Sequence, residues 1–391
     1  MSLRFQIVTY NLLSEKYGTP KGALSQDVLA IDPSPAWMTI EDRWLRVRAK
    51  LDTKVAPDVR AVICLQETSL EWTMRLVPFF AEHGYAIVYD NFSRPDSGYM
   101  GVALAVPLDK YTIVKHAMIK VGDELGRVTR TSTSSWSGAS SYGQVLRGWN
   151  MTAHKVAASW LPRFLGKRLA PERTYFDEWT NAVSKPNTLL ALQLVSKEKD
   201  KPTTFCVGTY HMPCRFVTPT MTASHGAMLM HQMDQFSGVV DKVPFVLAGD
   251  YNLRPHSEIY GRLVGGAGTS VRDLCDVAPW HRVAWSFDVP LSLQSAYPAS
   301  GLLGGGAKEP LFTTRTQPSW QKTPFADTLD YLFFSAPLVP VAIERLPFDT
   351  HRHQIAAVGD DLAATLNAPM YPNALEPSDH LLIGATFELA H

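Results

Sequence analysis

Short apolar runs that stop abruptly at a polar residue most constrain the fold of this 391-residue chain. Such runs predict buried strands. They lie at residues 5–9, 59–65, 86–89, 101–106, 189–195, 204–209, 245–248, 329–334 and 381–387. Residues 40–55 and 221–240 have the spacing of helices, and the first has an apolar stripe of Trp44, Leu45, Val47, Leu51 and Val55. Many strands and few helices predict an α/β fold in which two packed sheets are flanked by helices.

The bulk composition limits the class of protein. Apolar residues make up 46% of the chain, which is enough to fill a large core. The 37 Lys and Arg residues balance the 37 Asp and Glu residues, so the formal net charge is zero. This balance excludes a globally basic nucleic-acid-binding protein, although it allows a local basic patch.

The cysteines and the apolar runs indicate the compartment. Cys64, Cys206, Cys214 and Cys275 form no C-x-x-C pair, which favours free thiols over disulfides or a cysteine zinc site. The chain enters a strand-like run at once, without a secretory signal, and no apolar run approaches the roughly 18 residues of a membrane span. We therefore expect an intracellular, cytoplasmic protein without a transmembrane segment.

Polar side chains follow the predicted strands at the points where α/β proteins place their active sites. In chain order they are Asn11, Glu67, His211, Asp250, Asn252, Asp330, Asp379 and His380. A single acidic residue at a strand end is usually only a turn former. Asp250 and Asn252, however, point to the same face if their strand continues. Asp330 and Asp379 also offer carboxylates that would fix the charge of His380.

The residue types at these strand ends suit a hard cation. Carboxylates and an Asn carbonyl, without a Cys or His cluster, favour Mg²⁺ or Mn²⁺. His351-x-His353 is an alternative ligand pair that would suit zinc. Its surroundings read as a polar loop, so we expect magnesium or manganese.

These motifs together resemble those of a known superfamily. In order, TYN, LQE, TYH, GDYN, TLDYLFF and SDH resemble the endonuclease/exonuclease/phosphatase superfamily, from residue 9 to residue 380. The resemblance implies a four-layered α/β sandwich with two central mixed β-sheets flanked by helices. It also implies that residues 1–391 form one catalytic domain.

A closer resemblance is to the branch that contains the deadenylases, nocturnin, the Angel proteins and a mitochondrial 2′,5′-phosphodiesterase. The segments that support it are TYNLLSEKY, LQSAYP, Phe312-Thr313 and PFADTLDYLFF. Leu13 stands where many other superfamily members have Asp, as it does in this branch. The sequence departs from the branch at Thr209-Tyr210-His211-Met212, where N-T-H-L is usual, and in the HMPCRF that follows.

The resemblance implies a role for each residue. Glu67 would hold Mg²⁺, with Asn11 and Asp379 close to the metal. Asp250 would orient and deprotonate the attacking water, while Asn252 and His211 donate hydrogen bonds to phosphate oxygens. His380, held by Asp330, would stabilise the developing negative charge. Two aromatic residues are predicted to bind substrate: Phe325, which would stack on a nucleobase, and Phe312.

One long stretch has no counterpart that we recognise in the superfamily. Residues 126–171 contain seven Lys or Arg residues and no Asp or Glu, and the Ser- and Thr-rich first part predicts a loop. We expect an insertion at about residues 126–187 whose basic and aromatic residues face the substrate, with Arg163, Lys167 and Arg168 as binding residues. Single-stranded nucleic acid suits such a surface, and an anionic membrane surface suits it almost as well.

The expected function is that of a Mg²⁺-dependent phosphodiesterase, namely a deadenylase-like 3′-exoribonuclease that acts on RNA or nucleotide phosphoesters. One alternative is a phosphatase for a small phosphorylated nucleotide or a cyclic-phosphate RNA end. A sphingomyelinase-like lipid phosphodiesterase in peripheral contact with a membrane is a further alternative. The complete set of strand-end residues argues against an inactive binding module. The sequence indicates no protein partner.

Overall fold

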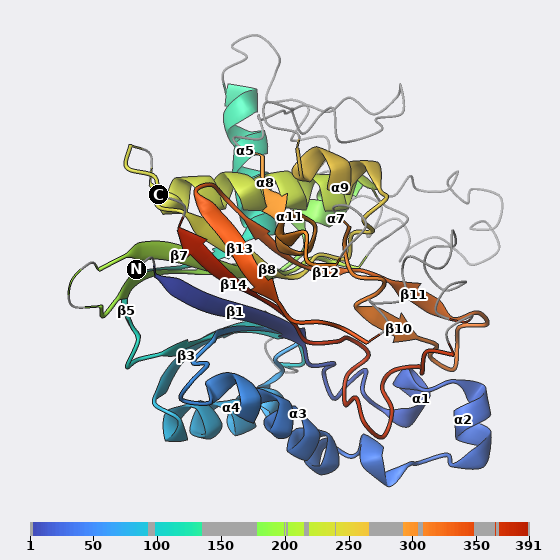
Figure 1. The fold of residues 1–391 in the computed structure, drawn as a ribbon. Helices are drawn as coiled ribbons and strands as arrows, with labels where there is room; N and C mark the ends of the chain where they lie inside the picture. Colours follow the sequence, from blue (N-terminus) through green and yellow to red (C-terminus); the bar gives the residue numbers. More distant parts are fainter. Residues whose placement is uncertain are drawn as a thin grey trace, which may run out of the picture.

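Two β-sheets packed face to face, with helices on both outer sides, form the centre of the computed structural model (Figure 1). The structure describes residues 3–92, 98–134, 178–198, 200, 202–214, 219–238, 240–265, 292–303, 308–347, 364 and 367–389. Helices cover the outer face of each sheet, so the chain builds four layers, as the sequence predicts. Among the described residues, no helix is both long and apolar enough to cross a membrane.

The first sheet has six strands in its described part and contains the first strand of the chain. Its order is β13 (Leu338–Ile343), β14 (Ile383–Leu389), β1 (Arg4–Asn11), β2 (Val62–Gln66), β4 (Gly101–Pro107) and β3 (Tyr85–Asn91). Strands β1 and β2 are parallel, whereas the other neighbours are antiparallel. The central strands β2 and β4 are buried along their whole length, which is why their sequences are continuously apolar.

The second sheet repeats this arrangement. Its order is β5 (Tyr111–Lys120), β6 (Thr188–Ser196), β7 (Thr204–His211), β8 (Phe245–Asp250), β12 (Asp330–Phe334) and β9 (Gln294–Ser295). Here β7 and β8 are the parallel pair. A small antiparallel hairpin of β10 (Thr314–Thr316) and β11 (Phe325–Asp327) projects beyond the sheets (Figure 1).

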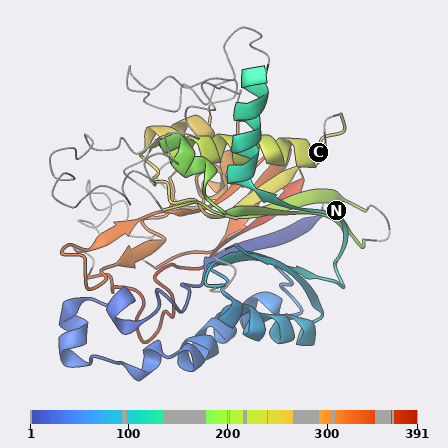
Figure 2. The same cartoon turned by 180° about the vertical axis from the view of Figure 1, so that it is seen from behind.

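The helices lie outside both sheets, as the two opposite views show (Figures 1 and 2). The N-terminal half of the chain provides α1 (Pro20–Ala23), α2 (Gln26–Ile31), the short 3₁₀ helix η1 (Ala36–Met38), α3 (Ile40–Val55), α4 (Leu70–Glu82) and α5 (Val121–Ser134). The later part provides α7 (Glu178–Val183), α8 (Pro219–Ser237), α9 (Glu258–Leu263) and α11 (Ala296–Ser300). Helices α3 and α4 pack on the first sheet, and α8 packs on the second.

Helix α3 illustrates how local sequence and packing combine. Its N-cap is Thr39, whose side chain accepts a hydrogen bond from the backbone N–H of Asp42. Its buried face has a spacing of four residues and consists of Arg43, Val47, Leu51 and Val55. The predicted apolar stripe is therefore wrong at Leu45, which is 63% exposed, because the buried position one turn before Val47 belongs to Arg43.

The predicted strands are all present, but the strands β5 and β13 and several helices, among them α4 and α5, were not predicted. Strand β5 alternates irregularly between exposed and half-buried residues, and β13 is exposed at several positions, so neither gives a continuous apolar run. Helix α5 continues to Ser134, which corrects the prediction of a loop for the first Ser- and Thr-rich residues. Residues 135–177, which make up most of the predicted insertion, lie outside the described residues.

The main core lies between the two sheets and is built from side chains of both. Phe5 of the first sheet and Phe205 of the second stack with their ring centroids 4.0 Å apart. Cys64 and Leu192 belong to the same buried cluster, and the side chain of each is fully buried. Near the carboxyl ends of the strands this core becomes polar. There Gln66 donates to the hydroxyl groups of Thr9 and Thr209, each at 2.9 Å, and so ties the sheets together.

Candidate active site

The polar residues predicted from the sequence meet at one end of the sandwich, where the strands that carry them end or begin. Asn11 ends β1, while His211 and Asp250 lie opposite each other at the ends of β7 and β8. Asp330 begins the antiparallel strand β12 opposite Asp250. The side-chain amide of Asn11 donates to Oδ2 of Asp250 at 3.0 Å, so the two sheets are joined at this point.

Gly249 lets β7 and β8 approach each other just before Asp250. A Cβ atom on Gly249 would lie 2.1 Å from the carbonyl oxygen of Tyr210, so only glycine fits. The close approach brings Nε2 of His211 to 3.5 Å from Oδ2 of Asp250. Packing therefore explains why glycine precedes Asp250 at this strand end, and the chemistry of the site explains the aspartate.

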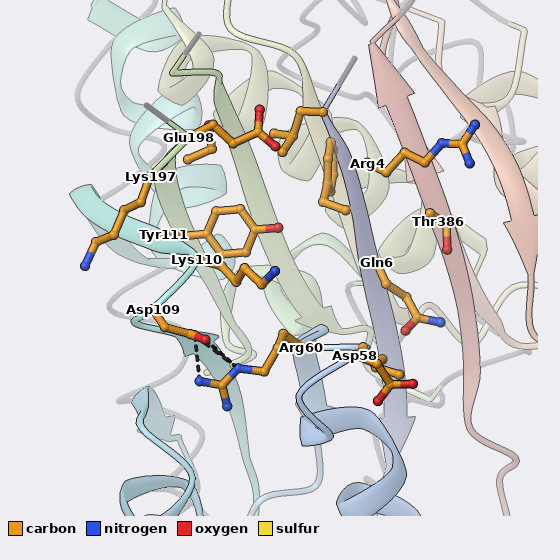
Figure 3. A pocket seen from close by; sticks show the side chains of 14 residues that line it. Arg4, Gln6, Asp58, Arg60, Asp109, Lys110, Tyr111, Lys197, Glu198 and Thr386 are labelled. Carbon is orange, nitrogen blue, oxygen red and sulfur yellow. Dashed lines mark hydrogen bonds and ion pairs between the residues drawn. The ribbon is translucent and has the colours of Figure 1, made fainter. Parts of the chain in front are cut away.

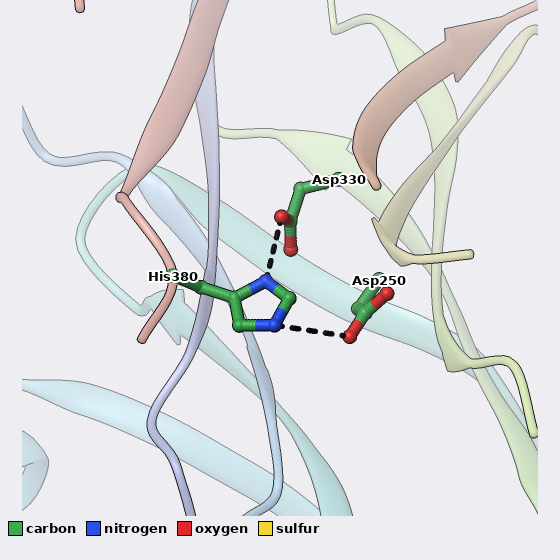
Figure 4. Close-up of side chains that lie close together, drawn as sticks. All are labelled: Asp250, Asp330 and His380. Carbon is green, nitrogen blue, oxygen red and sulfur yellow. Dashed lines mark hydrogen bonds and ion pairs between the residues drawn. The ribbon is translucent and has the colours of Figure 1, made fainter. Parts of the chain in front are cut away.

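Asp330 holds His380 by a short hydrogen bond (Figure 4). The Nδ1 atom of His380 lies 2.8 Å from Oδ2 of Asp330, and its Nε2 atom points toward Asp250, 3.7 Å from Oδ2. Thr313 donates its hydroxyl to the same oxygen of Asp330 at 2.6 Å. The Ser378 hydroxyl accepts from the backbone N–H of His380 at 3.2 Å. The imidazole is therefore fixed on both its ring and its backbone.

The carboxylates around His380 favour its charged form. Burial alone would lower the pKa of the imidazole, but the carboxylates of Asp330, Asp250 and Asp379 outweigh burial and raise it well above the usual value. Oδ1 of Asp330 is buried without a hydrogen-bond partner among the described residues, and so is Nδ1 of His211. These two atoms leave hydrogen-bonding capacity in the site that water or a substrate can use.

Asn11 and Glu67 form the wall of the site that belongs to the first sheet. The amide nitrogen of Asn11 donates to Oε1 of Glu67 at 3.2 Å as well as to Asp250. Its amide oxygen accepts from the backbone N–H of Leu13 at 3.0 Å, while Ser14 N–H donates to Oε2 of Glu67 at 2.8 Å. Asn11 thus positions two carboxylates, and its oxygen retains one lone pair for a cation.

Backbone strain accumulates at this end of the sandwich. Leu13, Glu67 and Asn252 have φ values of 54°, 55° and 48°, in the left-handed region that residues other than glycine rarely adopt. Arg60 and Asn367 do so elsewhere in the described structure, so the feature is not confined to the site. At Glu67 and Asn252 the unusual turn directs a functional side chain at the end of a strand.

The donor set fits a divalent cation. Glu67 and the partly buried Asp379 offer the carboxylate oxygens that Mg²⁺ and Mn²⁺ prefer. Burial raises the pKa of Asp379 to about 6; His380 opposes this shift, and the carboxylates of Glu67 and Asp250 add to it. A cation between Asp379 and Glu67 would relieve this repulsion. Asp250, Asp330 and His380 also lie within ligating distance of one another, but the charge on His380 suits them better to handling protons.

Arg43 of α3 binds the loops that carry the proposed metal ligands, a role that sequence analysis missed. Its guanidinium donates to the carbonyl oxygens of Leu12 and Leu13, at 2.6 and 2.5 Å, and to that of Pro377 at 2.8 Å. The side chain is 1% exposed and lies over the ring of Trp72 at 5.2 Å. Burial lowers the pKa of Arg43 to about 10. The sequence did contain a signal for its burial, because Arg43 lies four residues before Val47 and so on the same face of the helix.

The predicted substrate-binding residues have different outcomes. Phe325 lies half-buried at the edge of the hairpin, with the guanidinium of Arg254 at 5.2 Å from its ring centroid. Phe312 is 1% exposed and packs in the core near Tyr371, which corrects the prediction that it contacts substrate. Its neighbour Thr313 contacts Asp330 instead. Asn252 remains next to Asp250, its amide donating to the Met212 carbonyl at 2.8 Å. The remaining predicted residues, Arg163, Lys167 and Arg168, and the alternative zinc ligands His351 and His353, lie outside the described residues.

A pocket lies at the opposite end of the sandwich, where β1 begins (Figure 3). It has a volume of about 550 Å³ and is lined by residues that include Arg4, Arg60, Asp109 and Lys110. Arg60 and Asp109 form an ion pair at 2.6 Å across it. Strand β1 places this pocket roughly 25 Å from Asn11, so it is separate from the site described above.

Comparison with known proteins was made on both sequence and fold. A curated relative, carbon catabolite repressor protein 4 homolog 4 of Arabidopsis thaliana, is 31% identical over 146 residues. The match spans 37% of this chain and only 27% of that relative. The solved structure of ANGEL2, a 2′,3′-cyclic phosphatase in complex with adenosine-2′,3′-vanadate, is 18% identical with a TM-score of 0.61. It covers 99% of this chain and 96% of its own.

A second solved structure, the human Nocturnin catalytic domain with a bound sulfate anion, is 17% identical with a TM-score of 0.57. It covers 100% of this chain and 96% of its own. These similarities confirm the predicted resemblance to the deadenylase, nocturnin and Angel branch. The family profile described as Endonuclease/Exonuclease/phosphatase family matches residues 8–380, which is nearly the whole chain. The chain therefore belongs to the endonuclease/exonuclease/phosphatase family, whose members hydrolyse phosphoric esters.

Proposed function

We propose that this chain is a metal-dependent phosphodiesterase that removes nucleotides from the 3′ end of RNA. The observation that carries the proposal is the arrangement of Asp250, His380 and Asp330, in which a buried carboxylate faces an imidazole held by a second carboxylate. This arrangement places a proton acceptor and a cationic hydrogen-bond donor side by side, where both could reach a phosphate group under attack by water.

The residues divide the work of hydrolysis. Asp250 accepts a proton from the attacking water as its oxygen forms a bond to phosphorus. His380 donates a hydrogen bond from Nε2 to a phosphoryl oxygen, and Asp330 keeps the imidazole charged and oriented. Asn252 and His211 would add hydrogen bonds to the phosphoryl oxygens. The bond from phosphorus to the leaving oxygen then breaks, that oxygen takes up a proton from solvent, and Asp250 returns to solvent the proton that it accepted.

Glu67 and Asp379, with Asn11, would hold the divalent cation, which we propose is Mg²⁺ or Mn²⁺. Such a cation neutralises charge on the phosphoryl and leaving oxygens. Asn11 contributes by its two amide hydrogen bonds, which hold Glu67 and Asp250 at a fixed separation.

A nucleotide substrate is supported by the surroundings of the site. Phe325 is a half-buried ring at the edge of the hairpin that begins beside Thr313, and Arg254 approaches its face. An aromatic ring with a guanidinium group beside it suits a nucleobase that is joined to a phosphate. Among the proteins similar to this chain, ANGEL2 was solved with an adenosine-containing ligand.

A substrate panel with Mg²⁺ tests the proposal. It compares poly(A), mixed RNA, DNA, 2′,5′-linked oligomers, 2′,3′-cyclic phosphate ends, NADPH and sphingomyelin, each with and without EDTA. We expect hydrolysis of RNA from the 3′ end that EDTA stops and fresh Mg²⁺ restores. Full activity after exhaustive chelation would refute the metal dependence. If the protein hydrolyses only the cyclic phosphate ends or only sphingomyelin, that compound and not RNA is the substrate.

A further inference from the structure

Three side chains beside Glu67 have no role in the hydrolysis proposed above, and together we call them the Tyr17 ledge: Lys16, Tyr17 and Tyr99. Tyr17 is 44% exposed and Lys16 is also exposed, while Tyr99 is half-buried. An exposed ring that meets a second, half-buried ring at the edge of an active site calls for an explanation.

The ledge is an aromatic pair with a cation beside it. The rings of Tyr17 and Tyr99 meet edge-on, with centroids 6.0 Å apart and planes at 80°. The ammonium group of Lys16 lies 3.5 Å from the centroid of Tyr99 and 5.8 Å from that of Tyr17. Aromatic rings bind nucleobases and a neighbouring ammonium group binds phosphate, so the combination suits a single-stranded nucleotide chain.

Hydrogen bonds fix the ledge next to the proposed metal ligand Glu67. The backbone N–H of Ser14 donates to Glu67, and Ser14 O accepts from the N–H groups of Tyr17 at 3.1 Å and Gly18 at 2.7 Å. Tyr17 therefore lies in the same tight turn as Ser14, only three positions after the residue that binds Glu67. The side chain of Glu15 accepts a hydrogen bond from Ser69, which follows β2 closely. The turn is therefore anchored to the side chains of both Glu67 and Ser69.

The phenol of Tyr17 interacts electrostatically with residues that follow strands of both sheets. Burial, together with Tyr99, Glu67 and Cys214, raises the pKa of Tyr17 to about 12. Glu67 follows β2 in the first sheet, whereas Cys214 follows β7 in the second. The hydroxyl group of Tyr17 is thus near the ends of strands from both sheets, which is where the site lies.

We propose that the Tyr17 ledge is a subsite for a second nucleotide, joined through the scissile phosphate to the nucleotide that Phe325 holds. This inference rests on the proposed function and names its substrate class more closely. The substrate would be a single-stranded phosphodiester of at least two nucleotides, and a phosphomonoester would leave the ledge empty. The competing interpretation is that Lys16 and the two rings only stabilise the turn.

Binding measured without hydrolysis distinguishes the two interpretations. The background is the Asp250→Ala protein in Mg²⁺, so that the probe is not cut. Affinities for the trinucleotide ApApA and for AMP are measured by competition against a fluorescein-labelled oligoadenylate. Tyr17→Ala and Lys16→Ser are compared with Tyr89→Ala, a control on the exposed face of β3 whose ring is 41% exposed.

We expect Tyr17→Ala to weaken ApApA binding on the order of 10-fold while the AMP affinity changes much less. Lys16→Ser should reduce the dependence of ApApA affinity on salt by a slope of up to about one unit. Tyr89→Ala should leave both affinities as they are. The thermal unfolding midpoint of each variant is measured alongside, because a purely structural role would lower it without changing the ratio of the two affinities.

Two results would overturn the subsite. One is an equal loss of ApApA and AMP affinity in Tyr17→Ala, and the other is a parent protein that binds ApApA no more tightly than AMP. Neither result bears on hydrolysis, so a protein that cleaves RNA in the substrate panel would keep the proposed function and lose the subsite. The opposite outcome is also possible. If the protein cleaves no phosphoester but binds ApApA more tightly than AMP, and Tyr17→Ala abolishes this difference, the subsite is kept and the proposed function is lost.

Discussion

The two ends of the sheet sandwich carry similar residues but use them differently. At the end where β1 begins, Arg60 forms an ion pair with Asp109 (Figure 3), and Arg4 forms one with Glu388. At the other end, Asp250, Asp330 and His380 are buried together (Figure 4). One side-chain atom of Asp330 and one of His211 have no hydrogen-bond partner among the described residues.

This difference shows that unsatisfied chemistry, more than hollow shape, marks the active site. The pocket of about 550 Å³ lies at the end where ion pairs are satisfied. The other end holds buried carboxylates at close range and an imidazole with a raised pKa. Mutual repulsion of this kind is retained where function requires it.

The largest effect is expected from matched Asp→Ala variants at the two ends. Asp250→Ala should reduce kcat about 10⁴-fold, because it removes the proton acceptor, while the thermal midpoint stays constant or rises as repulsion is relieved. Asp109→Ala should leave kcat unchanged. Steady-state kinetics on the best substrate of the panel measures both. Near-normal turnover in Asp250→Ala would contradict the mechanism.

The next effect concerns the pair of Asp330 and His380. Asp330→Ala and His380→Ala should each reduce kcat about 10²- to 10³-fold, and the double variant should lose little more, because Asp330 acts through the imidazole. The measurement is a double-mutant cycle on kcat. Losses that multiply would show that the two residues work separately.

Buried and exposed arginines should differ in stability. Arg43→Met leaves three carbonyl groups without their donor and should lower the free energy of unfolding by about 3 kcal/mol. Arg4→Met removes an ion pair whose arginine is 69% exposed and should cost less than about 1 kcal/mol. Urea denaturation measures both. Similar losses would show that burial does not distinguish these arginines.

The smallest effect is a pH dependence of the metal-free protein. Since the pKa of Asp379 is raised to about 6, its carboxyl group binds a proton more tightly in the folded chain than in the unfolded chain. Stability in EDTA should therefore rise by about 2 kcal/mol as the pH falls from 7 toward 4, and Mg²⁺ should suppress the rise at the upper end of this range. Asp379→Asn should lack this component. An unchanged pH profile in Asp379→Asn would assign the effect to other groups.

The strands and their functional ends could be predicted because both depend on local sequence. A buried strand is apolar wherever its neighbours lie, so β1, β2, β7, β8 and β14 appear as runs of a few residues. The residues that follow them, such as Asn11 and Asp250, are recognisable by type. Strands β5 and β13 escaped prediction because one face of each is partly exposed, which breaks the apolar run.

Only the tertiary structure decided which residues act on one another. Arg43 looks like a surface residue of an amphipathic helix until the loops at Leu12 and Pro377 are seen around its guanidinium. Phe312 looks like a binding residue until the core closes over it. The physical reason is that the local sequence shows the type of each residue and predicts its secondary structure, but not its partners. The partners of a buried charge can come from distant segments, as Leu12 and Pro377 do for Arg43, and they are fixed only when the chain has folded.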